Sequence, residues 1–471
     1  MTRVLLISQD VMGKAMAGPG IRYFNLARVL APHVQLTLAI PDTSPPDALA
    51  GEFAFEVVRY TSQQWPSLAA AAAQAEVIIF PSDLASEMPE LSEVPACLVI
   101  DGYDPLLAEW LFVQSHEPLE AQQAQWHERM RLLTRQYLVG DFYLCASERQ
   151  RDWWLGLLEA HGRISPRTFR QDPTLRGLID VVPFGLSSAA PRHGRPVIKG
   201  VWNGIGVDDK LVLWGGGLWP WLDPLTAIRA IDQVRHQRQN VRLVFPGTRH
   251  PNPILAGLVT YTQVAKDLAA TLGLLDRHVF FGDWLPYEDW PGVLLESDVA
   301  LSLHTDTLEA RLAFRSRILE YIWAGLPTVA TQGDATSDVI AQMGLGVVVG
   351  YQDVDAVAAA IVTLLDEPRA LRQPQFTQTQ RELTWEKAAA PLIAFCQHPR
   401  RAADRADRAQ GESGMVAGNP FYEARGQQKQ SQFAAELEAA RQETRRWQEL
   451  AQRYEQGRFM KLMRWIKTGR T

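Results

Sequence analysis

The sequence alternates short apolar runs with longer amphipathic stretches. Up to residue 184 the apolar runs include RVLLIS, VQLTLAI, VIIF, ACLVI and IDVVPF, and each has the length of a strand. Segments with helical period, such as GIRYFNLARVLAP, lie between most of them. Parallel strands need long connections, which pack as helices on the sheet. The alternation therefore predicts a doubly wound α/β domain.

A break at residues 189–206 divides the alternation into two series. This segment, AAPRHGRPVIKGVWNGIG, is rich in Pro, Gly and basic residues and has no clear period. The alternation starts again with KLVLW at residues 210–214. We predict two Rossmann-like domains that face a cleft, at residues 1–190 and 200–374, and 471 residues are enough for each to bury its own core.

The remainder of the chain is predicted to close the second domain and then to leave it. Residues 375–398 predict a closing helix, and the polar, Gly- and Ala-rich residues 399–432 predict a flexible linker. Residues 433–471 predict a helical tail, and its first part, 433–454, has apolar residues in steps of four and three. That spacing fits either a coiled-coil partner or a solvated helix with a weak apolar stripe.

The last fifteen residues combine basic and apolar side chains. Residues 457–471 contain no acid, and their basic residues recur at a step of three beside Phe, Leu, Met, Trp and Ile. A helix of this kind suits docking on an anionic membrane surface, and packing on the protein itself is the alternative.

Composition excludes several classes of protein. A formal net charge of −6 gives no reason to expect nucleic-acid binding. Cys97, Cys145 and Cys396 are widely spaced, so neither a disulfide framework nor a zinc site is indicated, and a reducing, cytoplasmic setting fits best. No run of eighteen apolar residues occurs, so we expect no membrane-spanning helix. Any contact with the inner face of a membrane would be peripheral and made by the tail.

Glycines follow the first strand of each series. Gly18 and Gly20 precede the first helix, and Gly216 and Gly217 end the strand KLVLW. In doubly wound sheets, ligands bind beyond the carboxyl ends of the strands, where glycines let backbone N–H groups face phosphates. Neither loop has the GxGxxG spacing of a dinucleotide dehydrogenase. The two loops predict a phosphate-bearing ligand between the domains.

Charged residues follow an apolar strand of the second domain. In DVALSLHTDTLEARLAFRSRILEYIWAG the strand ends at Leu303, so His304, Asp306 and Glu309 are expected in a loop at the cleft. A strand end of this kind places polar side chains where the ligand binds.

Two arginines flank the next predicted helix start, near Ser316. Arg315 and Arg317 are disfavoured there by the helix dipole, whereas an anion is favoured, so both need a partner. A diphosphate would satisfy them, and Glu320 could accept hydrogen bonds from the hydroxyls of a ribose. The alternative is an arginine–carboxylate network with the two acids of the preceding loop.

The run RSRILEYIWAGLPTVAT, followed by GDATSDVIAQMGLGVVV, resembles the donor-site segment of retaining nucleotide-sugar glycosyltransferases. These are the group 1, or family-four, enzymes of the GT-B fold, and the resemblance covers about residues 1–397. It implies transfer of a sugar from a nucleotide diphosphate sugar to a glycan or lipid-linked acceptor, with retention and without a metal or other cofactor. It also implies that the donor lies against the second domain and the acceptor against the first. Together with the basic tail, it favours a place in cell-surface polysaccharide or lipid-linked glycan assembly.

The chain departs from the family pattern at the acid that precedes Glu320. The family's E-x7-E pair would place its first glutamate at position 312, where Leu312 stands, so Glu309 is the candidate replacement, with Asp306 as the alternative. The family's Arg and Lys at the start of the second domain are also absent, so Arg249 and the two arginines of the 315–317 segment are the candidates to bind the phosphates in their place.

Two aspartates follow a strand of the first domain, where the acceptor is expected. Asp101 and Asp104 are candidates to orient an acceptor hydroxyl, although Asp104-Pro105 is also an ordinary helix start. Two other functions stay open: a nucleotide-sugar epimerase of the same architecture, and a non-catalytic sugar-nucleotide-binding protein that assembles partners. Leu312 is the feature that favours the non-catalytic alternative.

Overall fold

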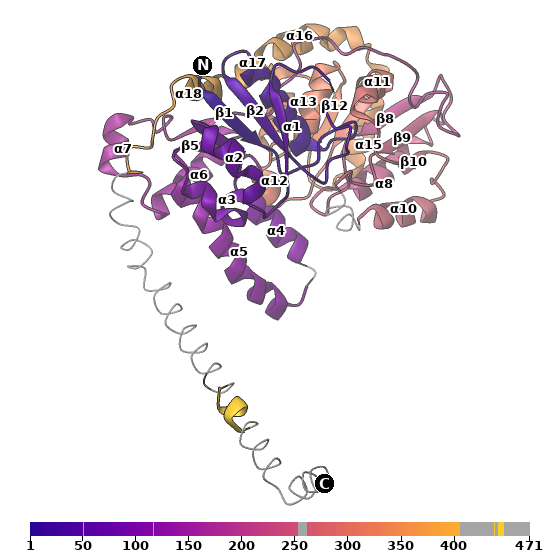
Figure 1. Ribbon diagram of the computed structural model, residues 1–471. Coiled ribbons are helices and arrows are strands. Elements are labelled where there is room, and N and C mark those ends of the chain that lie inside the picture. Colours follow the sequence, from indigo (N-terminus) through magenta and orange to yellow (C-terminus); the bar gives the residue numbers. More distant parts are fainter. Residues whose placement is uncertain (50, 116, 253–260, 406–437, 439–440, 447–471) are drawn as a thin grey trace, which may run out of the picture. The chain divides into compact units, whose positions relative to one another are not determined.

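The computed structural model describes residues 1–49, 51–115, 117–252, 261–405, 438 and 441–446. Residues 1–403 form one compact unit, and residues 404–471 form another. Within the first unit the strands make two parallel sheets, each with helices around it (Figure 1). The predicted α/β class and the two doubly wound sheets are confirmed.

The first sheet has seven strands in the order β3-β2-β1-β4-β5-β6-β7. Its strands are β1 (Arg3–Ile7), β2 (Gln35–Pro41), β3 (Glu56–Tyr60), β4 (Val77–Pro81), β5 (Cys97–Asp101), β6 (Phe142–Cys145) and β7 (Ile179–Val181). Strand β1 pairs with β2 on one side and with β4 on the other, so the winding reverses there. The loop after β1, which leads to Gly18 and Gly20, therefore begins at a topological switch point, where ligands bind in such sheets.

The second sheet has six strands in the order β10-β9-β8-β11-β12-β13. Its strands are β8 (Lys210–Trp214), β9 (Val241–Pro246), β10 (Val279–Gly282), β11 (Val299–Ser302), β12 (Thr328–Thr331) and β13 (Gly346–Val349). Strand β8 pairs with β9 and with β11, and this is again the point where the winding reverses. Gly216 and Gly217 lie in the loop that follows it.

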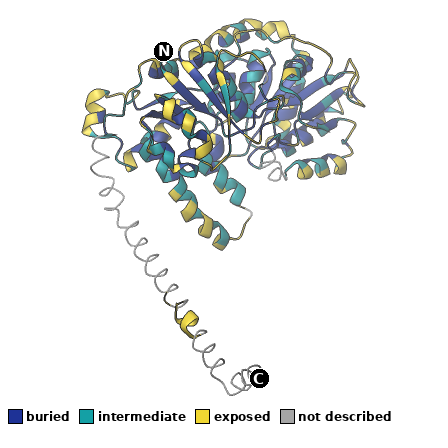
Figure 2. Cartoon of the chain, in the orientation of Figure 1, coloured by how far each residue is buried: buried dark blue, intermediate teal, exposed yellow. Residues whose placement is uncertain are grey.

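Helices connect the strands and cover both faces of each sheet. In the first half they are α1 (Gly18–Leu30), α2 (Pro66–Gln74), α3 (Leu84–Glu87), α4 (Leu106–Gln114), α5 (Leu119–Val139), α6 (Glu148–Ala160) and α7 (Pro166–Gln171). In the second half they are α8 (Pro224–Val234), α10 (Tyr261–Thr271), α11 (Trp290–Glu296), α12 (Leu308–Leu312), α13 (Ser316–Trp323), α14 (Ala335–Met343) and α15 (Val354–Asp366). Because both faces are covered, the central strands are buried, whereas the edge strand β3 exposes Glu56 and Arg59 and most other exposed residues lie on helix surfaces and loops (Figure 2).

The segment expected as one closing helix contains three: α16 (Gln373–Glu382), α17 (Trp385–Ala388) and α18 (Ala390–Gln397). Thr384 interrupts the helical run because its side chain accepts from the backbone of Lys387 and caps α17. Helix α16 packs on α13 in the second half. Trp385 and Phe395 belong to the core of the first half, so this segment ties the two halves together.

The predicted linker and tail lie mostly outside the described residues. Of residues 404–471 the structure describes 404–405, 438 and 441–446, and residues 441–446 are helical. The predicted basic segment 457–471 lies wholly outside the described part, and the predicted seam 433–454 lies mostly outside it. Among the helices that are described, none has both the length and the hydropathy needed to cross a membrane.

Candidate functional site

The N-termini of α1 and α13 meet where the two halves of the first unit touch. A Cβ atom at Gly18 would lie 3.6 Å from Ser316 Oγ and 3.7 Å from the Tyr103 hydroxyl oxygen. Neither helix has a side-chain hydrogen bond at its N-cap. The first N–H groups of a helix have no partner within it and carry the positive end of the dipole, so this junction can accept an anion.

Arg317 brings a cation to this junction. Its Nη1 atom is buried and has no hydrogen-bond partner among the described residues. Its guanidinium carbon lies 5.6 Å from the centre of the Trp214 ring, and its Nη2 would be 3.6 Å from a Cβ atom at Gly216. Burial lowers the pKa of Arg317, and the positive charge of Arg315 lowers it further. A cation with a buried, unfilled donor is costly unless an anion reaches it.

The glycines of the two loops serve different purposes. Gly216 has a φ of +76°, a left-handed conformation that side chains disfavour, and it faces Arg317. A Cβ atom at Gly20 would come within 2.8 Å of the Val11 carbonyl oxygen, so packing alone requires this glycine. A Cβ atom at Gly217 would lie 3.4 Å from Trp219 Nε1. Gly18 and Gly216 are thus the two that border the candidate anion site.

Arg315 does not have the free guanidinium that the sequence suggested. Its Nη1 and Nη2 donate to the two carboxylate oxygens of Glu309 at 2.7 and 2.8 Å, and both side chains are buried. Glu309 was expected in a loop, but it lies in the short helix α12, which Thr307 caps by accepting from the backbone of Ala310. The arginine–carboxylate alternative describes this pair, in which Glu309 balances the charge of Arg315 and binds its two terminal nitrogens, while Nε is buried without a hydrogen-bond partner among the described residues.

Glu320 lies one turn into α13. Its Oε2 accepts a hydrogen bond from Trp290 Nε1 at 2.9 Å. Burial raises the pKa of Glu320 to about 7, against the opposing effects of Trp290 and of the positive charge of Arg317. Near neutral pH this carboxyl group is therefore divided between its ionised and its neutral form.

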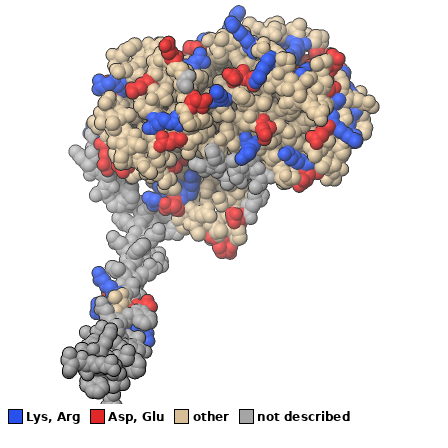
Figure 3. All heavy atoms as spheres, turned by 45° about the vertical axis from the view of Figure 1, so that its right-hand side comes forward, with Lys and Arg blue, Asp and Glu red and all other residues tan. Residues whose placement is uncertain are grey.

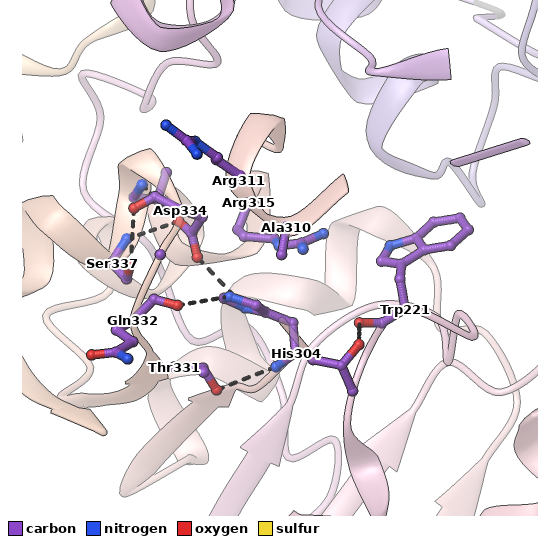
Figure 4. A network of polar contacts seen from close by, with 12 residues as sticks. Trp221, His304, Ala310, Arg311, Arg315, Thr331, Gln332, Asp334 and Ser337 are labelled. Carbon is purple, nitrogen blue, oxygen red and sulfur yellow. Dashed lines mark hydrogen bonds and ion pairs between the residues drawn. The ribbon is translucent and has the colours of Figure 1, made fainter. Parts of the chain in front are cut away.

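His304 belongs to a buried network beneath the start of α14. Its Nε2 donates to the Gln332 carbonyl at 3.0 Å, and its Nδ1 lies 3.6 Å from Asp334 Oδ2 (Figure 4). Burial lowers the pKa of His304 to about 3, and the charge of Arg315 adds to the shift. The imidazole is therefore neutral. Its hydrogen bond to Gln332 holds the loop before α14, whereas the sequence had predicted that this side chain would contact the donor.

The two aspartates of the first half differ sharply. Both oxygens of Asp101 accept from Arg22, at 2.8 and 2.9 Å, and both side chains are buried. This ion pair joins α1 to β5 and departs from the expectation that Asp101 orients an acceptor. Asp104 is half-buried, and burial, followed by the charge of Asp101, raises its pKa to about 7.

Asp104 lines a small pocket of the first half that one residue of the second half, Leu312, also lines. The pocket has a volume of about 30 Å³, and its lining includes Gly102, Asp104, Gln150 and Leu312. The side chain at position 312 is therefore apolar and buried where the family pattern expects an acid. A wider surface hollow of about 710 Å³ lies on α16, and its lining contains none of the predicted site residues.

Of two further charged residues, the sequence predicted one for the site and missed the other. Arg249 is exposed in the loop after β9, two residues beyond Gly247. Glu109 was not predicted: it lies on α4, and burial, followed by the charges of Asp104 and Glu309, raises its pKa. Only the docking of α4 on α12 brings Glu109 to this place, so no local pattern could have indicated it.

Aromatic side chains fasten the loop after β1 to the second half. Trp219 stacks on Trp221 with ring centres 5.2 Å apart, and His250 contacts both Trp219 and Trp284. Trp284 Nε1 donates to the Met16 carbonyl of the first half at 3.2 Å. These rings therefore act as packing at the junction, and the ring of the tryptophan that ends β8 belongs to the core.

On the described part of the face drawn in Figure 3, basic and acidic side chains are interspersed. Within the described residues no group of three or more His, Cys, Asp or Glu is arranged to hold a metal ion.

Comparisons with known proteins identify the class. The family of group 1 glycosyl transferases matches residues 209–367, which span β8 to α15. No curated protein sequence matches the chain. The second half is a group 1 glycosyltransferase domain, as the sequence resemblance predicted.

Solved structures extend the likeness over both halves. Sucrose-phosphate synthase from Thermosynechococcus elongatus has a TM-score of 0.58 at 16% identity, over 84% of this chain and 98% of that one. HepE of Anabaena in complex with UDP and glucose has a TM-score of 0.59 at 15% identity, over 84% and 99%. The E. coli protein of trehalose-6-phosphate synthesis, bound with UDP-2-fluoroglucose, has a TM-score of 0.56 at 14% identity, over 85% and 100%. The chain therefore contains a group 1 glycosyl transferase domain at residues 209–367 and has the GT-B fold over both halves.

Proposed function

We propose that the protein transfers a glycosyl group from a nucleotide diphosphate sugar, whose diphosphate binds between the N-termini of α1 and α13. The observation that carries this proposal is the unpartnered, buried Nη1 of Arg317 beside Gly216. An anion at this point would satisfy the guanidinium and the free N–H groups of both helices. The complexes of HepE and the trehalose-6-phosphate protein with UDP compounds support a uridine nucleotide as the first ligand to test.

The same groups supply what a transfer step needs. Negative charge develops on the leaving diphosphate as the glycosidic bond breaks, and fixed positive groups lower that barrier. Arg317 and the two helix N-termini are in place before any ligand binds, which supports a reaction without a metal ion. Retention of configuration is proposed on the resemblance to the family.

Glu320 is proposed to hold the ribose. Trp290 fixes one of its oxygens, and a pKa of about 7 allows the carboxyl group either to accept or to donate a hydrogen bond at neutral pH. Vicinal hydroxyls present both a donor and an acceptor, so either form of the carboxyl group finds a match.

Asp104 is the proposed carboxyl group on the acceptor side. Asp101 and Glu309 each have both oxygens bound to an arginine, whereas Asp104 lies in the pocket beside Leu312. A carboxyl group with a pKa of about 7 can accept a proton from an acceptor hydroxyl near neutral pH.

Calorimetry with UDP and a panel of UDP-sugars tests the donor site. Arg317→Met should weaken UDP binding by about 10- to 100-fold, because a hydrogen bond to a charged group contributes roughly 1.5–3 kcal/mol. Arg311→Met is the matched control, since it removes an exposed positive charge one helix upstream. It should change UDP affinity by less than about twofold. Unchanged UDP binding in Arg317→Met would contradict the proposed site.

The non-catalytic alternative is favoured by one observation, the buried apolar side chain at position 312. Product analysis with and without candidate acceptors distinguishes it from both enzymes. Transfer to an acceptor supports the proposed function, epimerised or free sugar supports the epimerase, and binding without turnover supports the partner-assembling protein. We further propose that the acceptor belongs to cell-surface or lipid-linked glycan assembly, on the basis of the basic tail.

A further inference from the structure

The first turn of α6 reaches from the first half to the second. Ser147 Oγ accepts from the backbone N–H of Gln150 at 3.1 Å, as the capping-box spacing predicts. The side chain of Gln150 does not complete the box. Its Oε1 accepts from the Ala146 N–H at 2.6 Å, and its Nε2 donates to the carbonyls of Tyr103 and Leu312 at 2.8 and 2.7 Å.

These three partners determine the orientation of the amide. The Ala146 N–H can only donate, and the two carbonyls can only accept, so one assignment of the Gln150 oxygen and nitrogen satisfies all three. The side chain is 2% exposed, and water therefore does not compete for these hydrogen bonds. Tyr103 follows β5 of the first half and Leu312 ends α12 of the second, so one buried amide group joins the two segments.

Arg149 strengthens the same connection. It donates to the Gly333 carbonyl at 2.5 Å and to the Arg311 carbonyl at 3.3 Å, and it pairs with Asp338 at 2.9 Å. The carbonyls of Arg311 and Leu312 lie at the C-terminus of α12, where a helix leaves its last carbonyls without internal partners. A positive charge is also favoured at that end. Helix α6 therefore caps α12 from the other half of the protein.

This cap determines where α13 begins. Ala313 and Phe314 alone separate Leu312 from Arg315, and the pair between Arg315 and Glu309 ties α12 to α13. Because helix α6 holds the carbonyl at the end of α12, it also sets the position of α13 against the N-terminus of α1.

We propose that Gln150 is a positioning residue that registers the donor-binding end of α13 against the first half, and that it acts on transfer more than on nucleotide affinity. The inference rests on the proposed function, in which Arg317 and Glu320 of the second half make most of the contacts to the nucleotide, the N-terminus of α1 adds one to the diphosphate, and the acceptor lies against the first half. Misplacing one half against the other would then misalign the reacting atoms and loosen the α1 contact, while the contacts of Arg317 and Glu320 stay.

Gln380 provides a matched control. From α16 its Nε2 donates to the carbonyls of Ile322 and Trp323 at 2.8 and 3.1 Å, at the end of α13. The chemistry is closely similar, a glutamine amide that donates to two carbonyls and contacts a helix end, but both helices belong to the second half. Gln380→Met therefore removes comparable hydrogen bonds without touching the junction.

The kinetic test uses the full chain with the UDP-sugar that the binding panel identifies. Gln150→Met should lower kcat about tenfold, because the reacting atoms lose their alignment, and should raise the Kd for UDP by no more than about threefold. Gln380→Met should leave kcat within about twofold of the unmodified protein. An equal loss of UDP affinity and kcat in Gln150→Met, or an equal fall of kcat in Gln380→Met, overturns the positioning role.

Amide hydrogen exchange gives a readout that needs no donor. Gln150→Met should speed exchange over residues 309–317, and Gln380→Met should speed it over residues 320–326 only. Unchanged exchange over residues 309–317 in Gln150→Met overturns the inference whatever nucleotide the protein binds. Absence of nucleotide binding in the unmodified protein would instead contradict the proposed function and leave the exchange result to decide the structural connection.

Discussion

Glu320 carries a carboxyl group whose ionisation the folded protein opposes. Its pKa rises from 4.5 to about 7 because of burial, and its hydrogen bond from Trp290 and the nearby charge of Arg317 compensate only in part. A glutamine at this position keeps an oxygen for Trp290 Nε1 but has no charge to bury. We therefore expect Glu320→Gln to stabilise the protein at alkaline pH, even though it replaces a proposed ligand contact.

The size and sign of the effect follow from the pKa shift. One unit corresponds to about 1.4 kcal/mol, so the rise to about 7 amounts to roughly 3 kcal/mol of unfolding free energy. Between pH 4.5 and about 7 the folded state binds a proton that the unfolded state has released, so stability is present at low pH and lost as pH rises through 7. The Glu320→Gln variant has no proton to lose at this position and escapes that loss. Its advantage should be full above about pH 8 and absent below about pH 4.5.

Denaturant unfolding of Glu320→Gln and of the unmodified protein, at pH 8 and at pH 5, measures this difference in unfolding free energy. The first unfolding transition of residues 1–403 is the one to compare. Glu309→Gln is the matched control, because it makes the same chemical change on a carboxylate that Arg315 neutralises. It should destabilise the protein by about 3–5 kcal/mol, since it leaves a buried arginine without its partner. Equal stability of Glu320→Gln and the unmodified protein at pH 8, or a gain of the same size at pH 5, would refute the reasoning.

Two other predictions concern parts of the chain away from Glu320. Asp101→Asn should destabilise the protein by about 3–5 kcal/mol, because it leaves Arg22 buried with half of its bidentate contact. Chemical denaturation measures the loss of unfolding free energy. The double variant Arg22→Met with Asp101→Asn should lose less than the sum of the losses in the two single variants. A protein truncated before Phe433 should no longer sediment with vesicles that contain anionic lipid. The difference in sedimentation from the full chain should be largest at low salt, where charge attraction is least screened. Sedimentation equal to that of the full chain would rule out the tail as the membrane contact.

The sequence was sufficient for those features that are encoded locally. Alternating apolar and amphipathic segments predicted both sheets, because the period of burial along a strand or helix does not depend on distant residues. The glycines after β1 and β8 were predicted for the same reason, since glycines at a strand end are visible in a short window. Their placement at two switch points then follows from strand order, which the structure supplies.

Contacts between distant segments could not be predicted. Arg22 and Asp101 are 79 positions apart, and neither carries a local sign of its partner. Gln150 shows the difference most clearly: the S-x-x-Q spacing of Ser147 and Gln150 is that of a helix start, but the side chain of Gln150 donates to the Leu312 carbonyl, which is 162 positions away. The acid that pairs with Arg315 was placed in a loop because a helix of five residues has too few positions to show a period.

The charged residues near the N-terminus of α13 differ in role from the buried ion pair of the first half. Arg317 and Glu320 are suited to ligand binding, whereas Asp101 stabilises the fold. Arg317 has a donor without an anion, and burial disfavours the ionised form of Glu320, so both lower the stability of the unliganded protein. A bound diphosphate would satisfy the first, and ribose hydroxyls the second. Neutral replacements of these two should therefore raise stability while they weaken UDP binding. Asp101 is satisfied without any ligand, so its replacement should lower stability and affect binding only through the fold. Opposite changes in stability and affinity thus identify the residues that contact the donor.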